Sequence, residues 1–307
     1  MNLRDLGREY GFSEVFLLPN APYEDWARHH KGGAFHSNAD TLADDPNEVY
    51  PWANACMICV KAYEPYDDRE VVAAYYPASN AAYHAMKHFL KRLNEEGIRA
   101  ERAETPFRMQ LLQAGIGTCM DNRLWFYPPY GTYIHLEGAM LQLPEPVEYS
   151  GPLHNEPVCD HCGLCESVCT GALQSGKFDW KKCIRSYMEN QPMPEEFMPR
   201  LYCFLGCQQC QDICPKNKRP FVPVPEEVRR AMDPVRIVRG EYREALDILG
   251  KNMKKQLIRQ AIILCANRNK TEALPYLIHL KETAGEQFAQ ELEYAILCLQ
   301  KTANVVK

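Results

Sequence analysis

Short apolar runs and amphipathic stretches alternate along the first 150 residues. The runs Ser13–Leu18 and Cys56–Val60 are rich in β-formers and predict buried strands. Between Asn80 and Gly97 apolar residues recur at helical spacing, and Gly97 is a suitable helix end. A second helix is predicted over Pro106–Ala114, before Gly115. This alternation favours an α/β layer fold. The apolar residues of the first helix are Tyr83, Met86, Phe89, Leu90 and Leu93.

The same pattern continues to the end of this first segment. Leu124–Tyr127 and Thr132–Leu136 predict two strands, and Pro128–Gly131 predicts the turn that joins them.

The last segment, 220–307, has helical apolar faces throughout. Leu246–Gly250, Leu257–Ala266 and Ala273–Leu280 predict helices, and the polar run Asn267–Lys270 separates the last two. Such an antiparallel helix pair resembles a single HEAT-type repeat, which is normally an interaction surface. One such unit is marginal alone, so we expect it to pack on the preceding segment.

A chain of 307 residues has room for two or three domains. We predict a domain over 1–150, a cysteine-rich module over 151–219 and a helical domain over 220–307. Gly151-Pro152 and Pro220 bound the middle module, which metal sites would hold together in place of a large apolar core.

The net charge of −5 is unevenly distributed. Residues 1–213 carry 18 basic and 29 acidic side chains, and residues 214–307 carry 17 basic and 11 acidic ones. A basic C-terminal segment suits a polyanion such as RNA, and a solvated lysine-rich surface explains it equally well. The candidates for phosphate contacts are Lys216, Lys218, Arg219, Arg229, Arg230, Lys254, Lys255, Arg259 and Arg268.

Fourteen cysteines supply the most specific chemistry in the chain. Eight follow the spacing of a pair of [4Fe–4S] clusters: C-x2-C-x2-C-x3-C from position 159, one lone cysteine, and C-x2-C-x3-C-P from position 207. Three closely spaced thiolates bind one cluster, and the fourth cysteine of such a run binds the other. We assign cluster one to Cys159, Cys162, Cys165 and Cys214, and cluster two to Cys169, Cys183, Cys207 and Cys210.

Other interpretations of these cysteines fit less well. Disulfides need an oxidising compartment, whereas the chain shows no signal peptide and no apolar run of eighteen residues. We therefore expect a cytoplasmic protein that is not bound to a membrane. Paired CxxC motifs also suit zinc, but the x2-x2-x3 run with Cys-Pro is more specific for iron–sulfur clusters. Cys203 competes with Cys183 as a ligand of cluster two.

Three local patterns together resemble the tRNA epoxyqueuosine reductase family, whose members are corrinoid-dependent iron–sulfur proteins distantly akin to reductive dehalogenases. The cysteine set includes Cys183-Ile-Arg-Ser-Tyr187, which is similar to the family's CISY segment. The stretch from Ala114 to Thr132 is similar to AGLGWIGKNTLLINPxYGS, and the stretch from Tyr76 to Leu93 is similar to YxRGxDYHxxxRxRL.

Several positions depart from the family pattern. The family has a proton-donating Asp in a VDTGP-like context, where this chain has Ala103-Glu104-Thr105-Pro106. Glu104 is the nearest carboxylate, so it is the candidate proton donor, and a helix N-terminal carboxylate is the structural alternative. Asp121 replaces the Lys of GKN, Ala82 replaces the Asp of DYH, and Thr170 replaces the Pro after the fourth cysteine.

The resemblance implies a nitroreductase-like α/β layer that holds cobalamin, a bacterial ferredoxin-like module with two [4Fe–4S] clusters, and a HEAT-like tail. It also implies reduction of epoxyqueuosine to queuosine in tRNA, with electrons from an external donor such as ferredoxin or flavodoxin. We expect a monomer. Residues in register with the family that would contact the corrinoid are Tyr76, Tyr83, His84, Gly115, Gly117, Asn122, Tyr130, Gly131 and Thr132.

Two other functions fit the same residues. The missing Asp permits a related corrinoid reductase with a small-molecule substrate. Without catalysis, the protein would be a ferredoxin-like electron carrier or a corrinoid-activating partner. For Gly115 and Gly117 a helix end, and for Tyr83 core packing, are the structural alternatives to cofactor contact.

Overall fold

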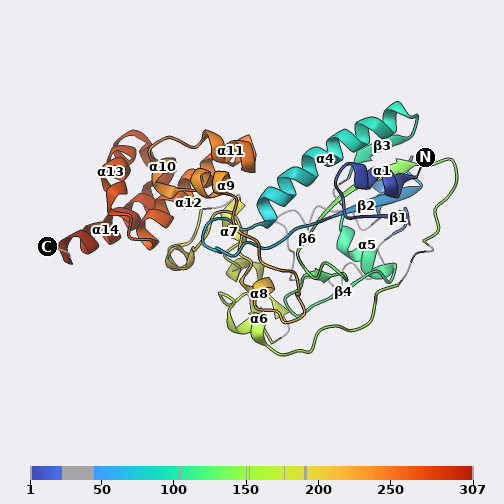
Figure 1. The fold of residues 1–307 in the computed structure, drawn as a ribbon, viewed down its shortest axis with the longest axis horizontal. Helices are drawn as coiled ribbons and strands as arrows, with labels where there is room; N and C mark the ends of the chain where they lie inside the picture. Colours follow the sequence, from blue (N-terminus) through green and yellow to red (C-terminus); the bar gives the residue numbers. More distant parts are fainter. Residues whose placement is uncertain are drawn as a thin grey trace. The chain divides into compact units, whose positions relative to one another are not determined.

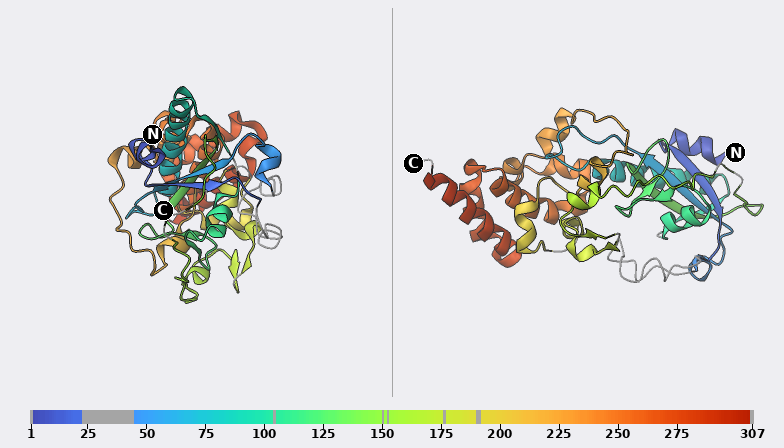
Figure 2. Two further views of the ribbon diagram at one scale, coloured as in Figure 1. Left: turned by 90° about the vertical axis from the view of Figure 1, so that its right-hand side faces the viewer. Right: turned by 90° about the horizontal axis from the view of Figure 1, so that it is seen from below.

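The computed structural model describes residues 2–22, 45–103, 105–149, 151, 153–175, 177–189 and 192–305. These residues form two compact units. The first unit comprises 1–64, 78–180 and 209–220, and the second comprises 65–77, 181–208 and 221–307. Figures 1 and 2 show the mixture of strands and helices in the first unit and the helices of the second.

A four-stranded antiparallel sheet is the centre of the first unit, with strand order β1-β2-β6-β3. The strands are β1 (Glu14–Pro19), β2 (Ala55–Ala62), β6 (Ile134–Gln142) and β3 (Arg99–Arg102). The predicted strands at Ser13–Leu18 and Cys56–Val60 are therefore confirmed as β1 and β2.

Both faces of the sheet are covered, which explains why β2 is apolar without alternation. Alternate side chains of β2 enter two different cores: Met57 and Cys59 lie in one, and Cys56 and Ile58 lie in the other. Helices α1 (Leu3–Glu9) and α4 (Tyr75–Glu95) cover the first face, and α5 (Phe107–Gln113) covers the second (Figure 1).

Helix α4 confirms the predicted helix but begins five residues earlier, at Tyr75. It ends as predicted, because Gly97 has a φ of 83° and the Ile98 amide bonds back to the Leu93 carbonyl. The alternative in which Tyr83 packs in the core is wrong, because Tyr83 is 44% exposed. Ala78 and Ala82 line the buried stripe of α4 together with the other predicted residues.

A buried ion network lies on the face of the sheet that α4 covers. Glu137 on β6 is 4% exposed, and it accepts hydrogen bonds from Arg102 Nε at 2.9 Å and from His135 Nε2 at 3.0 Å. Burial opposes ionisation, but these two bonds hold the pKa of Glu137 below its ordinary value. The network joins β3 to β6, and its hydrogen bonds compensate the buried negative charge of Glu137.

The predicted strand, turn and strand after α5 are present with different partners. Strand β5 (Trp125–Phe126) pairs with β4 (Thr118–Cys119), and β6 joins the main sheet. A single bridge between Tyr127 and Gly131 closes the turn.

Short elements lie along the cysteine-rich segments of the first unit. They are α6 (Leu164–Ser167), β7 (Leu173–Gln174), β8 (Lys177–Phe178) and α8 (Gln209–Asp212). Of these, α6 contains Cys165 and α8 contains Cys210. A 3-10 helix, Trp180–Lys182, follows β8.

The second unit is helical after Phe221, as predicted. Its helices are α9 (Glu226–Ala231), α10 (Pro234–Val238), α11 (Arg243–Leu249), α12 (Lys254–Asn267), α13 (Leu274–Thr283) and α14 (Ala289–Val305), with 3-10 turns at Lys251–Met253, Thr271–Ala273 and Gly285–Phe288. The predicted break between α12 and α13 is present, and Asn269 there has a φ of 53°.

Helix α12 packs on the segment that precedes the helical tail, which contains α7 (Ser186–Glu189) and the 3-10 helix Glu195–Arg200. Gln260, which is 1% exposed, donates to the Met188 carbonyl at 2.7 Å and accepts from the Leu205 amide at 2.7 Å. The tail thus shares one core with residues 181–208, as expected for a helical unit too small to stand alone. The three-domain division stays a prediction.

Candidate metal centre

Four predicted metal ligands lie around one cavity of the first unit. Cys159 and Cys162 lie in the loop before α6, Cys165 lies within α6, and Cys214 follows α8. Gly163 turns the chain between them with a φ of 73°, a value that favours glycine. Two segments that are fifty residues apart therefore supply one set of thiols.

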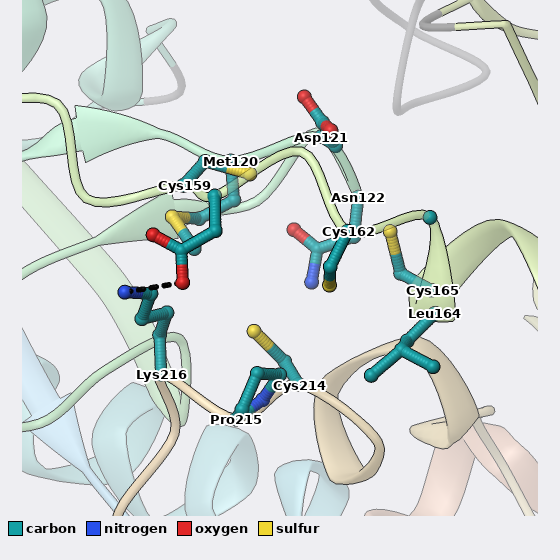
Figure 3. A pocket seen from close by; sticks show the side chains of 12 residues that line it. Met120, Asp121, Asn122, Cys159, Cys162, Leu164, Cys165, Cys214, Pro215 and Lys216 are labelled. Atoms are coloured by element: carbon teal, nitrogen blue, oxygen red, sulfur yellow. Dashed lines mark ion pairs between the residues drawn. The ribbon is translucent and has the colours of Figure 1, made fainter.

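The cavity has an empty volume of about 360 Å³, part of which is open to solvent. Figure 3 shows the side chains of Cys159, Cys162, Cys165 and Cys214 around it. The remaining lining residues are Met120, Asp121, Asn122, Asp160, Gly163, Leu164, Pro215 and Lys216.

The chemistry of the donor set decides which metal groups the cavity suits. Four thiols around one space are soft ligands, which suit zinc as well as iron–sulfur clusters. The x2-x2-x3 spacing with Cys-Pro is the feature that favours a cluster. The thiols around the cavity are therefore a donor set that fits the predicted cluster.

Amide side chains fix the segment that carries Cys214. Asn217 accepts from the Thr132 amide at 2.9 Å, and it donates to Thr132 Oγ1 and to the Gln211 carbonyl, both at 2.8 Å. Gln211 donates to the Thr132 carbonyl at 2.7 Å. Asn122 donates to the Cys210 carbonyl at 3.2 Å. Asn122 and Thr132 of the 114–132 stretch thus anchor the second cysteine run at Cys210 and just after Cys214.

A hydrogen-bonded pair and an ion pair border the cavity. Asp121 Oδ1 lies 2.9 Å from His161 Nδ1, and Lys216 Nζ lies 2.6 Å from Asp160 Oδ2 (Figure 3 draws the second). Burial raises the pKa of the Cys165 thiol, and the negative charge of Asp121 raises it further. Asp121, His161 and Cys159 have ligand atoms within 4.8 Å of one another, the one such group of three among the described residues.

The second predicted cysteine set is divided between the two units. Cys169 and Cys210 belong to the first unit, and Cys183 and Cys207 belong to the second. Cys203, the competing ligand, is 1% exposed and its thiol donates to the Gly206 carbonyl at 3.1 Å. Cys183 is half-buried, so of the two it is the more accessible ligand.

Several predicted corrinoid-contacting residues have structural partners within the protein. Gly117 has a φ of 73°, and a Cβ there would lie 2.3 Å from Trp125 Nε1. A Cβ on Gly131 would lie 2.3 Å from Asn217 Oδ1. Local packing therefore requires both glycines. Gly115 is also left-handed, with a φ of 71°, just after α5, as the helix-end alternative predicts.

The polar residues that were predicted to contact the corrinoid also have hydrogen-bond partners within the protein. Asn122 and Thr132 are 4% and 3% exposed and make the bonds described above. The Tyr130 hydroxyl donates to Glu14 at 3.2 Å. Burial raises the pKa of Tyr130, and the charge of Glu14 raises it further.

The remaining predicted corrinoid contacts, Tyr76, Tyr83 and His84, lie on α4. Tyr83 and His84 are exposed, and Arg102 lies over the Tyr83 ring, 5.1 Å from its centroid. Tyr76 belongs to the second unit, where it packs against the apolar core. Glu104, the predicted proton donor, lies outside the described residues.

The predicted RNA-contacting residues differ in exposure. Lys218, Lys254 and Lys255 are exposed, and Lys254 lies 4.8 Å from the centre of the Tyr242 ring. Arg259 is only 5% exposed, and its Nε lies 2.6 Å from Glu291 Oε1, so its burial and its carboxylate partner favour a structural role over a phosphate contact. Four more of the predicted phosphate-contacting residues form ion pairs: Lys216 with Asp160, Arg219 with Glu64, Arg229 with Asp68, and Arg230 with Glu244. The last one, Arg268, donates hydrogen bonds to the Glu70 and Tyr202 carbonyls.

Three residues of the site escaped the sequence reasoning. Gln211 follows Cys210 directly and Asn217 comes three residues after Cys214, and only this closeness to predicted ligands hinted at a role. His161 lies between two ligands of one set, where spacing drew attention to the cysteines alone.

The fold and the cavity together define a mixed α/β protein with a candidate metal site of four thiols. No protein-family model matches the chain. Two curated relatives are epoxyqueuosine reductases. One, from Bacillus anthracis, is 32% identical over 183 residues, which cover 54% of this chain and 46% of the relative. One from Pseudomonas aeruginosa is 24% identical over 341 residues, which cover 96% and 93%. The chain thus spans about half the length of the first relative.

Solved structures of epoxyqueuosine reductase share the fold. The Bacillus subtilis enzyme has a TM-score of 0.76 at 21% identity and is matched over 97% of this chain and 89% of its own. A structure with a tRNA-Tyr epoxyqueuosine-modified tRNA stem loop has a TM-score of 0.71 at 18% identity, over 97% and 98%. The resemblance to the epoxyqueuosine reductase family is confirmed: named epoxyqueuosine reductases are homologues of this chain, and their solved structures have its fold.

Proposed function

We propose that this protein is an oxidoreductase that reduces epoxyqueuosine to queuosine in tRNA. The observation that carries the proposal is the cavity formed by Cys159, Cys162, Cys165 and Cys214, in a chain homologous to epoxyqueuosine reductases. Conversion of the epoxide to an alkene releases its oxygen as water, and it consumes two electrons and two protons. A protein that relays single electrons between iron–sulfur clusters suits this stoichiometry.

The eight predicted cysteines would hold two [4Fe–4S] clusters. Cluster one would be bound by the four thiols that line the cavity. Cluster two would be bound by Cys169, Cys183, Cys207 and Cys210. The burial of Cys203 and its bond to Gly206 support Cys183 as the fourth ligand. The exposed loop at Cys162 makes cluster one the site where an external donor, such as ferredoxin or flavodoxin, delivers electrons.

A corrinoid would supply the reductive chemistry of the substrate step when it is bound. In this chain the exposed rings of Tyr83 and His84 are available to contact it. Asn122 and Thr132 would act through the scaffold, because their polar atoms already bond the cysteine segment. Glu104 would hold the proton for the substrate, because it is the carboxylate nearest to the position of the family's Asp.

The remaining parts of the proposal concern the RNA and the setting. Exposed Lys254 and Lys255 at the start of α12, and Lys218 in the first unit, would contact tRNA phosphates. The finer fold assignment is a nitroreductase-like layer, a ferredoxin-like module and a HEAT-like tail, in the three predicted domains. We place the protein in the cytoplasm as a monomer. Among the described residues no helix is long and apolar enough to cross a membrane.

The test is a single-turnover assay under anaerobic conditions. Protein with reconstituted clusters, cobalamin and a chemical reductant is incubated with tRNA that contains epoxyqueuosine, and the nucleosides are analysed by mass spectrometry. We expect queuosine to appear. Cys214→Ser should abolish turnover, because it removes a ligand of cluster one. Cys298→Ser on α14 is the matched control and should retain turnover, because that cysteine lies outside the predicted ligand set.

Other outcomes separate the alternatives. A protein that binds cobalamin and holds its clusters but leaves epoxyqueuosine-tRNA unchanged acts on a different substrate. A protein that holds clusters but leaves the visible spectrum of cobalamin unchanged is an electron carrier. Either result refutes the proposed reaction.

A further inference from the structure

We infer that Asp121 sets the reduction potential of cluster one, and that its carboxylate holds this potential lower than the same site would have with a neutral side chain. The inference rests on the proposed function, because it requires an iron–sulfur cluster in the four-thiol cavity. It assigns a role to the residue that stands where the family pattern has a lysine.

The position of Asp121 carries the argument. It lines the cavity together with Cys159, Cys162, Cys165 and Cys214, and its carboxylate lies within 4.8 Å of the Cys159 sulfur. The Asp121 side chain is 33% exposed, so solvent screens its charge only in part.

The carboxylate is also held in place. Both oxygens of Asp121 lie within hydrogen-bond distance of His161 Nδ1, at 2.9 and 3.0 Å. His161 lies in the ligand loop between Cys159 and Cys162, so this contact fixes the carboxylate against the loop that carries two ligands. The second carboxylate of the rim, Asp160, has a cation of its own, because Lys216 Nζ lies 2.6 Å from it.

The direction of the effect follows from charge. Reduction adds one electron to the cluster, and a negative charge nearby disfavours the reduced form, which lowers the potential. At about 4.8 Å one unit charge changes an equilibrium about fourfold at the dielectric of water and about a few hundredfold at that of a protein surface, so we take about tenfold for this partly exposed carboxylate. For a one-electron couple, tenfold corresponds to about 59 mV.

The experiment measures midpoint potentials by EPR-monitored redox titration of reconstituted protein at one pH, about pH 8.5, where an ordinary imidazole is neutral. We expect Asp121→Asn to raise one of the cluster potentials, with about a tenfold larger reduced-to-oxidised ratio at a fixed potential. Asp121→Lys should raise the same potential further. Asp160→Asn is the comparison within the rim and should have a smaller effect, because Lys216 balances that charge.

Glu95→Gln is the matched control for net charge. Glu95 lies at the end of α4, outside the cavity lining, and should leave both potentials unchanged. Iron content and circular dichroism of each variant establish that the clusters and the fold are retained.

The outcomes separate this inference from the proposed function. Intact cluster signals with unchanged potentials in Asp121→Asn and Asp121→Lys overturn the inference alone. An effect of Asp160→Asn equal to that of Asp121→Asn also overturns it, because the potential would then follow total charge. Wild-type protein without cluster signals overturns the inference together with the proposed function.

Discussion

The buried ion pair between Arg259 on α12 and Glu291 on α14 allows a quantitative test of the second unit. Their side chains are 7% and 3% exposed, and Arg259 Nε lies 2.6 Å from Glu291 Oε1. Glu291→Gln leaves the guanidinium buried, with Gln256 Oε1 as its remaining partner at 2.9 Å. Breaking such a pair costs about 3–5 kcal/mol, and Gln256 places the expected loss near the lower end, about 3 kcal/mol.

The assay is urea denaturation followed by far-UV circular dichroism, which reports on the helices. The exposed pair of Lys91 Nζ with Glu95 Oε1, at 3.7 Å, is the control, and Glu95→Gln should cost no more than about 0.5 kcal/mol. The double variant Arg259→Met with Glu291→Leu removes both charges and should lie within about 1 kcal/mol of the wild type. If Glu291→Gln costs no more than Glu95→Gln, the buried ion pair is refuted.

The same variants decide between the two roles of Arg259. The sequence predicted a phosphate contact, and the structure gives a buried partner. If the double variant is stable and binds tRNA like the wild type, Arg259 is structural. If it is stable but loses affinity, the RNA contact predicted from the sequence is correct.

Three further predictions concern separate parts of the molecule. The pKa of Glu137 is lowered in the folded state, so the contribution of this carboxylate to stability is present at neutral pH and is lost as the pH falls through that pKa. In denaturation measured over a range of pH, the difference in unfolding free energy between the wild type and Glu137→Gln should therefore become smaller in acid. A difference that becomes larger in acid contradicts the network with His135. Asn217→Ala removes three hydrogen bonds beside Cys214 and should destabilise the fold by about 1–3 kcal/mol and lower iron incorporation, whereas full iron content would show that the anchor is dispensable. Replacing Lys254 and Lys255 by Ala should reduce the slope of log affinity for tRNA against log salt by about 0.7 to 0.9 per lost phosphate contact, and an unchanged slope would place the RNA elsewhere.

The sequence predicted the features that depend on local pattern. The apolar run at β2 and the helical stripe of α4 were found because a buried strand and an amphipathic helix need only neighbouring residues to be recognised. The cysteine spacing likewise located the cavity, because cluster ligands occur at short fixed intervals.

The features that depend on distant partners could not be predicted in this way. Arg259 resembles any surface arginine until α14 brings Glu291 to it, 32 residues later in the chain. Tyr83 fits the apolar stripe by spacing, yet Ala78 and Ala82 occupy the narrow buried side of α4. Asn217 gains its role only from Thr132, 85 positions away.

Metal analysis of anaerobically purified protein tests the central claim most directly. Iron and acid-labile sulfide should each approach about eight per chain, and Cys162→Ser should lower both by about half. Stoichiometric zinc in place of iron, or iron far below this value after reconstitution, would contradict the assignment of the cysteine cavity and the reaction proposed from it.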